Sequence, residues 1–320
     1  MKRAVLAGFR GHSPKWFRLH GTLIEIVAVS GAWNPRAEEE AGAAGCAPAR
    51  YEDHYEMIAR EDADIALVWT RDPAEHCPVG RAALVRGMDV MLEKPLSNDA
   101  REAEAFAAEV ARSGRIAMVM QDVRWQNSAA AIKDAIVAGK CGTPYAIDVS
   151  LRGRFDGFVY EGIHLVDLTR YWYEREASWV MAAGVTPAHD PRDVDNVVSL
   201  TIGYDGGAVA HVTMDWSAQG HQHWIRARVE GDEAAMKIAW GQPVEIQRGS
   251  DPVERCPLSK TEDNSMKKLM THFLSSVDER SEPINRVADH LKTLDIVCAG
   301  WESVKTGQPV ALPYATGGAR

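Results

Sequence analysis

Short apolar runs alternate with helical patterns over the first 120 residues. Continuous apolar runs are typical of strands buried on both faces of a parallel sheet, and such strands are predicted at 4–7, 24–29, 65–69, 90–92 and 116–120. The spacing between them predicts helices or parts of helices at 16–21, 36–42, 55–59, 77–86 and 100–112. The last helix has Asp99 as its N-cap and ends before Gly114. Parallel strands joined by crossover helices are therefore expected here.

The pattern changes from about residue 145 onward, where longer strands alternate apolar and polar positions. Alternation of this kind is typical of antiparallel sheets with one buried face. The clearest hairpin pairs strands at 198–204 and 208–216 through the turn Asp205-Gly206-Gly207. Helices are predicted at 162–173 and at about 288–305. The second part of the chain is therefore expected to be an antiparallel sheet with a few helices.

Length and composition fit two globular domains of an α/β protein. The 320 residues are 46% apolar and 25% charged, which is an ordinary balance for folded proteins. The change of pattern divides the chain into domains at 1–120 and 121–320. The helix at about 288–305 is expected to pack back on the first domain.

Charge and apolar content exclude several classes of partner. With 36 Lys and Arg against 45 Asp and Glu, the formal charge is −9, the opposite of the basic footprint of nucleic-acid and anionic-membrane binders. The longest apolar runs fall far short of the roughly 20 residues that span a bilayer. Five scattered cysteines form no C-x-x-C pair, so they indicate neither a disulfide framework nor a metal site. We expect a cytoplasmic protein that binds a small molecule, and no nucleic acid, membrane or metal.

The loop after the first strand reads Ala7-Gly8-Phe9-Arg10-Gly11-His12. Glycine there lets the backbone approach a pyrophosphate held at the next helix N-terminus. Gly8 and Gly11 match the second and third glycines of G-x-G-x-x-G, but the first is missing, so an ordinary turn is the alternative. The next strand ends in Ser30-Gly31, where NAD-specific proteins carry an acidic residue. Arg36 is placed to meet the 2′-phosphate of NADP or to be a surface charge, so NAD and NADP both stay open.

Glu93-Lys94-Pro95 ends the strand at 90–92. In an open α/β sheet, ligands collect outside the carboxyl ends of the strands. The ammonium of Lys94 can there hydrogen-bond the oxygen of a bound alcohol or carbonyl and share its proton. A solvated loop lysine is the alternative.

The segment Gly162-Ile163-His164-Leu165-Val166-Asp167 opens a predicted helix. His164 and Asp167 are three residues apart and share one helix face. The positive end of the helix dipole favours a neutral imidazole, which can act as a base. The alternative is a capping or core histidine held by Asp167.

The remaining histidines carry weaker signals. His221 and His223 share one strand face, but no third ligand stands at a metal-binding spacing. His76 is placed to face the cofactor loop or to cap a helix.

Taken in order, these segments resemble the Gfo/Idh/MocA family of NAD(P)-dependent oxidoreductases. The resemblance covers nearly the whole chain and is carried by residues 7–11, 27–29, 34–37, 70–76, 87–96, 122–125, 142–145, 162–167 and 306–310. It implies an N-terminal Rossmann domain and a C-terminal α/β domain with a large, mostly antiparallel open sheet. That sheet usually forms an oligomer interface in the family, so a homo-oligomer, dimer or tetramer, is expected through it.

The resemblance also implies residue roles. In such enzymes the E-K-P lysine, here Lys94, lies beside the nicotinamide and the substrate hydroxyl, and the bond to its proline is often cis. The second-domain pattern is D-x-G-x-H-x-x-D, in which the first aspartate and the histidine join the lysine in handling the proton and orienting substrate. His164 and Asp167 match the later positions, and Tyr160 stands where the first aspartate belongs.

Tyr160 changes the expected chemistry, because a tyrosine with a pKa near 10 donates a hydrogen bond or acts as an acid. It cannot supply the permanent negative charge that would hold and polarise His164. Asp156, Glu161 and Asp167 are the candidates to compensate.

We therefore predict an enzyme that moves a hydride between NAD or NADP and a secondary alcohol or carbonyl carbon of a sugar, polyol or related molecule. His164 would take the hydroxyl proton, Lys94 would hydrogen-bond the oxygen, and Tyr160 completes the catalytic set. The predicted cofactor-binding residues are Gly8, Phe9, Arg10, Gly11, Gly31, Arg36, Thr70, His76, Glu93 and Lys94. The predicted substrate-binding residues are Asp122, Arg124, Trp125, Arg152, Arg154, Tyr160 and Asp167. The alternatives are an inactive NAD(P)-binding sensor or regulator of the same fold, and a vestigial cleft whose sheet serves only assembly.

Overall fold

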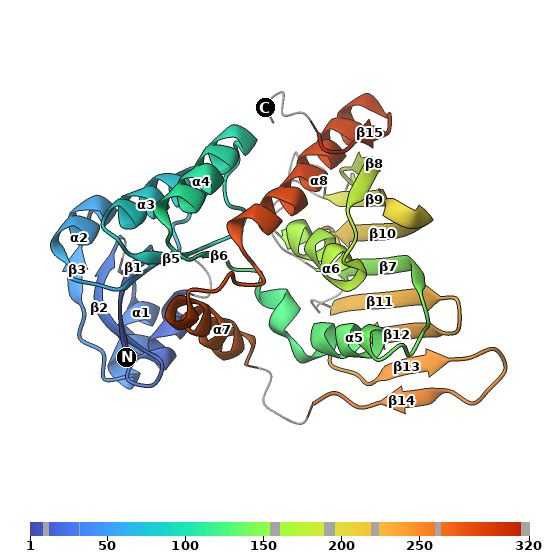
Figure 1. Cartoon of the computed structure of the whole chain (residues 1–320), viewed down its shortest axis with the longest axis horizontal. Helices are drawn as coiled ribbons and strands as arrows, with labels where there is room; N and C mark the ends of the chain where they lie inside the picture. Colours follow the sequence, from blue (N-terminus) through green and yellow to red (C-terminus); the bar gives the residue numbers. More distant parts are fainter. Residues whose placement is uncertain are drawn as a thin grey trace. The chain divides into compact units, whose positions relative to one another are not determined.

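The computed structural model describes residues 1–8, 13–31, 33–153, 161–188, 196–218, 224–259 and 264–314. The chain forms two compact units, whose elements are labelled in Figure 1. Among the described residues, the first unit comprises 1–120 and 266–291, and the second comprises 121–265 and 292–314.

The first unit is built on a six-stranded parallel sheet in the order β3-β2-β1-β4-β5-β6. The strands are β1 Lys2–Ala7, β2 Ile24–Ser30, β3 Ala49–Tyr51, β4 Ile65–Val68, β5 Asp89–Leu92 and β6 Ala117–Val119. Every residue of β4 and β5 is buried, as the continuous apolar runs predict. This confirms the expected Rossmann-type sheet. The three-residue edge strand β3 was not predicted, because two of its residues are exposed and it has no apolar run.

Helices lie on both sides of this sheet (Figure 1). They are η1 Ser13–Leu19, α1 Pro35–Ala43, α2 His54–Arg60, α3 Pro73–Val85, α4 Ala100–Ser113 and α7 Ser265–Glu279, whose first residue falls in the second unit. The helix expected at 16–21 is a 3₁₀ helix, η1. The predicted cap of α4 is confirmed, since Asp99 accepts a hydrogen bond from the Arg101 N–H and Gly114 ends the helix at φ +63°.

The second unit is built on a nine-stranded mixed sheet in the order β14-β13-β12-β11-β7-β10-β9-β8-β15. The strands are β7 Pro144–Arg152, β8 Ala177–Val185, β9 Val197–Tyr204, β10 Ala208–Asp215, β11 Trp224–Gly231, β12 Ala235–Ala239, β13 Val244–Gln247, β14 Glu254–Cys256 and β15 Val310–Ala311. Neighbouring strands are antiparallel except β7 and β10. The predicted hairpin is confirmed, with Tyr204 opposite Ala208 across the turn η4 Asp205–Gly207.

Helices cover one face of the mixed sheet (Figure 1). They are η2 Asp122–Trp125, α5 Asn127–Val137, α6 Ile163–Tyr173 and α8 Val287–Thr306, which begins in the first unit and continues in the second. The strand β7 shows the resulting division, since Ile147, Val149 and Leu151 are buried while Asp148 and Arg152 are exposed. One face is therefore core, and the other carries polar side chains.

Within the described part of the chain, no helix combines the length and apolar content that a membrane crossing requires.

Candidate functional site

The candidate region of the first unit lies at the carboxyl edge of the parallel sheet, where β1 and β4 are neighbours and the strand order reverses. Gly8 follows β1 with φ +88°, and a Cβ there would collide with the Trp69 carbonyl oxygen and lie 2.7 Å from the Thr70 Cα. Gly31 follows β2 with φ +96°, and its Cβ would lie 3.6 Å from the Gly8 Cα. The ends of three strands thus approach one another through their backbones and form a cradle at the switch point, where dinucleotides bind in Rossmann-type sheets.

The end of β2 carries no carboxylate in the sequence Ser30-Gly31. Ser30 is buried, and its hydroxyl lies 2.8 Å from Nδ1 of His54 at the start of α2. Arg36 is exposed in the first turn of α1. Nearby, the guanidinium of Arg50 lies 4.1 Å from the centre of the Trp33 ring. Sequence reasoning missed His54, because a histidine at the start of a helix carries no signal of what it faces.

The turn with Lys94 is held largely by its main chain. The Lys94–Pro95 bond is cis, and Lys94 is buried with 8% of its surface exposed. The buried ring of His76, on α3, lies between two carbonyl oxygens, with Nδ1 2.7 Å from that of Pro95 and Nε2 3.1 Å from that of Thr70. A neutral imidazole has one N–H to donate, so it can satisfy only one of these carbonyls at a time. The His76 ring therefore lies between the end of β4 and the turn that contains Lys94, within hydrogen-bond distance of both.

Two further contacts fix this turn. Glu93 is buried, and its Oε2 accepts a hydrogen bond of 2.9 Å from the Lys94 N–H. His290, at the start of α8, accepts the Leu96 N–H at Nε2 over 3.2 Å. Sequence reasoning missed His290, which lies 194 residues from Leu96.

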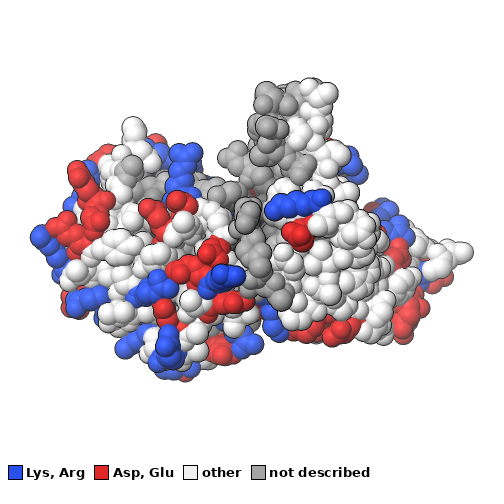
Figure 2. Space-filling model, turned by 90° about the horizontal axis from the view of Figure 1, so that it is seen from above, with Lys and Arg blue, Asp and Glu red and all other residues white. Residues whose placement is uncertain are grey.

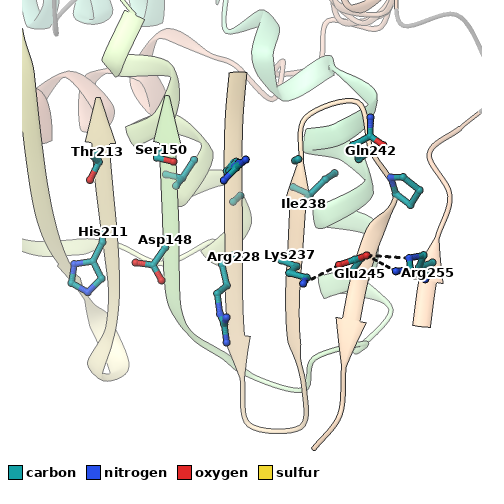
Figure 3. Close-up of a pocket in the computed structure, with 15 residues that line it drawn as sticks. Asp148, Ser150, His211, Thr213, Arg228, Lys237, Ile238, Gln242, Glu245 and Arg255 are labelled. Atoms are coloured by element: carbon teal, nitrogen blue, oxygen red, sulfur yellow. Dashed lines mark hydrogen bonds and ion pairs between the residues drawn. The ribbon is translucent and has the colours of Figure 1, made fainter. Parts of the chain in front are cut away.

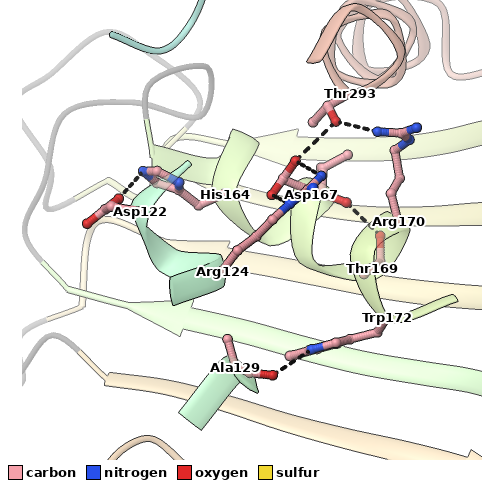
Figure 4. Close-up of polar contacts among 10 residues, drawn as sticks. Asp122, Arg124, Ala129, His164, Asp167, Thr169, Arg170, Trp172 and Thr293 are labelled. Carbon is pink, nitrogen blue, oxygen red and sulfur yellow. Dashed lines mark hydrogen bonds and ion pairs between the residues drawn. The ribbon is translucent and has the colours of Figure 1, made fainter. Parts of the chain in front are cut away.

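The candidate region of the second unit lies where η2 meets α6 (Figure 4). His164 stands in the first turn of α6 and is 5% exposed. Its Nε2 lies 3.7 Å from Oδ1 of Asp122, the first residue of η2, and 4.0 Å from Oε2 of Glu161. These distances are too long for hydrogen bonds and short enough for ion pairing. Carboxylates so placed stabilise a positive charge on the ring and oppose the helix dipole.

Arg124 and Asp167 bind each other in the same region (Figure 4). Nε and Nη2 of Arg124 donate to the two oxygens of Asp167 over 2.5 and 2.6 Å, with 6% and 2% of the respective side chains exposed. Thr293 of α8 accepts from Arg170 over 3.0 Å and donates to Asp167 over 3.4 Å. This is a buried bidentate ion pair whose oxygens have additional support. Sequence reasoning missed Thr293 and Arg170, since neither stands in a motif.

Other predicted site residues are more scattered. Trp125 is half-buried at the end of η2, and Arg152 is exposed at the end of β7. The predictions for Phe9, Arg10, Gly11, Arg154, Asp156, Tyr160, His221 and His223 fall outside the described residues. Within the residues that the structure describes, no cluster of three or more His, Cys, Asp or Glu side chains is arranged to hold a metal ion.

The polar face of the nine-stranded sheet forms a groove of about 740 Å³ (Figure 3). Strand register places one row of mostly charged side chains across it, namely His211, Asp148, Arg228, Lys237, Glu245 and Arg255. Lys237 and Arg255 each lie 3.0 Å from Glu245. On the view in Figure 2, blue Lys and Arg are interspersed with red Asp and Glu and do not gather in one basic patch among the coloured residues.

A parallel sheet with a backbone cradle at its switch point is the architecture of dinucleotide-binding oxidoreductases. Residues 3–121 match the family model described as "Oxidoreductase family, NAD-binding Rossmann fold", and residues 129–237 match the "GFO/IDH/MocA C-terminal domain". The chain belongs to the Gfo/Idh/MocA family of NAD-binding oxidoreductases.

Similar curated proteins are dehydrogenases. A D-apiose dehydrogenase from Paraburkholderia graminis is 26% identical, and the alignment covers 95% of this chain and 86% of that protein. The scyllo-inositol 2-dehydrogenase (NAD(+)) of Bacillus subtilis is 27% identical, with coverage of 90% and 89%.

Solved structures share the fold. An oxidoreductase from Agrobacterium radiobacter, in complex with NAD+, L-tartaric acid and magnesium, superposes with a TM-score of 0.85 at 19% identity, covering 97% of this chain and 98% of that one. The aldose-aldose oxidoreductase of Caulobacter crescentus, complexed with glycerol, gives 0.84 at 21% identity, covering 98% and 100%.

Proposed function

We propose that this oxidoreductase is a dehydrogenase or reductase that acts on a secondary alcohol or carbonyl carbon of a sugar, polyol or related hydroxylated molecule. The similarity to D-apiose and scyllo-inositol dehydrogenases supports this substrate class. The observation that carries the proposal is the environment of His164, which is buried in the first turn of α6 and faces two carboxylates. This environment suits a group that gains and loses a proton.

The residues of the chain divide the work. NAD or NADP supplies hydride transfer at the nicotinamide ring when bound. His164 takes the hydroxyl proton during oxidation and returns it during reduction, while Asp122 and Glu161 stabilise the imidazolium that forms. Lys94 donates a hydrogen bond to the reacting oxygen and stabilises its developing negative charge. Gly8 and Gly31 leave room for the dinucleotide backbone.

We further propose that the bound substrate contacts Asp122, Trp125 and Arg152, together with Arg154 and Tyr160. The exposed Arg36 and the missing carboxylate at the end of β2 are compatible with either dinucleotide, so binding of both NAD+ and NADP+ should be measured.

A second candidate function is an NAD(P)-binding sensor without turnover. It is favoured by Tyr160 in place of the family aspartate and by the missing first glycine before Gly8. Absorbance of reduced nicotinamide at about 340 nm, followed over a panel of sugars and polyols that includes D-apiose and scyllo-inositol, separates the two. Turnover of any member supports the enzyme, and tight dinucleotide binding without turnover across the panel supports the sensor. Failure to bind either dinucleotide would leave only a role in assembly.

We also propose that the chain forms a cytoplasmic homo-oligomer through the polar face of its mixed sheet. The row of side chains in the groove carries charges of both signs, which suits a self-complementary contact. Trp179 and Met181 on the same sheet are 38% and 45% exposed. Met181→Glu should lower the mass measured by light scattering. Val137→Glu, at a 73% exposed position on α5, is the matched control and should leave the mass unchanged.

A further inference from the structure

Two charged contacts join the same two short elements in the second unit. Asp122 and Arg124 stand two residues apart on η2, and His164 and Asp167 stand three residues apart on α6. Asp122 lies against His164, and Arg124 is paired with Asp167 (Figure 4). Because each element contributes to both contacts, the position of η2 on α6 sets the distance from Asp122 to His164.

The charge beside His164 does not come from its own helix. Asp167 is one turn away on α6, but both of its oxygens accept hydrogen bonds from Arg124, which neutralises it. The carboxylates that face Nε2 of His164 among the described residues are Asp122 and Glu161. The structure therefore brings a negative charge to this ring from a segment about 40 residues earlier in the chain.

Of the two carboxylates, Asp122 should have the larger electrostatic effect on His164. It is closer to Nε2, at 3.7 Å against 4.0 Å, and its side chain is 17% exposed against 29% for Glu161. A less exposed pair is screened less by water and salt. Glu161 also precedes α6 in the chain, whereas the Arg124–Asp167 pair fixes the element that carries Asp122.

We propose that Asp122 is the positioning residue that supplies the permanent negative charge at His164, in the place of the family aspartate that is Tyr160 here, and that the Arg124–Asp167 pair holds it there. The proposal rests on the proposed function of His164 as the base. Asp122 thereby stabilises the imidazolium formed when the substrate hydroxyl gives up its proton. Arg124 and Asp167 act on the reaction only by fixing the distance from Asp122 to His164.

The first test needs no substrate. Titration of His164 is followed by NMR of the whole protein, with the signal assigned from its loss in His164→Gln. A nearby carboxylate favours the charged ring, so Asp122→Asn should lower the pKa of His164 by about one unit, and Glu161→Gln should lower it by less. Asp122→Glu should keep most of the wild-type value. An Asp122→Asn titration equal to the wild-type curve, or a larger effect of Glu161→Gln, would overturn the proposal.

The second test uses the reaction. Alcohol oxidation needs a neutral base, so the acid limb of kcat/KM should move to lower pH in Asp122→Asn by the same amount, with kcat reduced about tenfold because the base is weaker. Adding Tyr160→Asp to Asp122→Asn should return the acid limb of kcat/KM to its wild-type pH and should restore kcat. A higher KM with an unmoved limb would show that Asp122 only binds substrate, and would also overturn the proposal. If the wild-type protein turns over no substrate, the proposed function fails, while the NMR titration still decides the role of Asp122.

Discussion

The turn at Lys94 and the junction of η2 with α6 are held in place by different forces. The turn is fixed by hydrogen bonds between its main chain and three side chains: the Pro95 carbonyl accepts from His76, and the Lys94 and Leu96 N–H groups donate to Glu93 and His290. The junction is fixed by the side chains of Arg124 and Asp167, which are charged, buried and bidentate. A net hydrogen bond contributes about 1 kcal/mol, whereas breaking a buried ion pair costs several times more. The two regions should therefore respond differently to substitution.

The difference also bears on how each region can vary. In the turn, one partner of each of these hydrogen bonds is a main-chain group, so only the side-chain partner can be lost by substitution. A junction held by charged side chains needs both partners, because one alone leaves an uncompensated charge in the core. The sequence contains recognisable segments in both regions, at 87–96, 122–125 and 162–167, but only the structure shows which side chains of the junction pair.

Both regions should be indispensable to turnover, which is the largest effect that we expect. Lys94→Ala and His164→Ala should each lower kcat about 10²-fold to 10⁴-fold, with dinucleotide binding mostly kept, because both groups act on the reacting oxygen or proton. Stopped assays of turnover and fluorescence titrations with NAD+ and NADP+ measure the two quantities. Lys292→Ala, which removes an exposed ion pair with Glu176, is the control. Near-normal rates in both variants would contradict the assigned roles.

The buried ion pair should dominate the stability of its region. Asp167→Asn leaves Arg124 with an unbalanced charge and should lower the free energy of unfolding by about 3–5 kcal/mol. The pair of Asp89 with Arg280 in the first unit is the control, since Nη1 of Arg280 donates to both oxygens of Asp89 but the arginine side chain is 45% exposed.

Asp89→Asn should cost less, about 1 kcal/mol for the lost pair. Urea unfolding of both variants measures the costs. Equal losses would mean that burial does not separate the two pairs.

The next largest loss of stability should come from substitution at Gly8, where strand ends of the first unit approach through their backbones. Gly8→Ala combines a positive φ with a collision against Trp69, and should destabilise by about 2–4 kcal/mol. Gly139→Ala is the control, because φ is also positive, +67°, but a Cβ there meets nothing within 4 Å. It should cost about 1 kcal/mol. Thermal unfolding measures both losses of stability. A Gly8 variant as stable as the Gly139 variant would contradict the close backbone approach at Gly8.

A dependence of stability on pH should come from His272, and it is the smallest effect that we expect. His272, on α7, accepts the Ile284 N–H at Nε2, and burial lowers its pKa from 6.5. Since the unfolded ring binds its proton more tightly, the contribution of His272 to stability is present above pH 6.5 and is lost as pH falls toward the lower folded pKa. The melting temperature should thus fall between pH 7.5 and pH 5.5, and fall less in His272→Gln. The same slope in both proteins would contradict this.

Local signals in the sequence predicted much of the molecule. Apolar runs located the buried strands, Asp99 and Gly114 marked both ends of α4, and Asp205-Gly206-Gly207 marked the hairpin. Each of these depends on residues within one element or turn. The short edge strand β3 and the 3₁₀ form of η1 were missed, because neither has an apolar period of its own.

The sequence by itself also determined the family, and it predicts Lys94 and His164 as the two reacting groups, because each stands in a short contiguous motif. Only the tertiary structure decided what surrounds them. Asp167 binds Arg124, which is 43 residues away in the chain, and Thr293, which is 126 residues away. Asp122 and His164 stand in different sequence motifs, and the fold brings them together. Strand order and helix packing bring such charges together, and no local pattern encodes a distance between elements that are far apart in the chain.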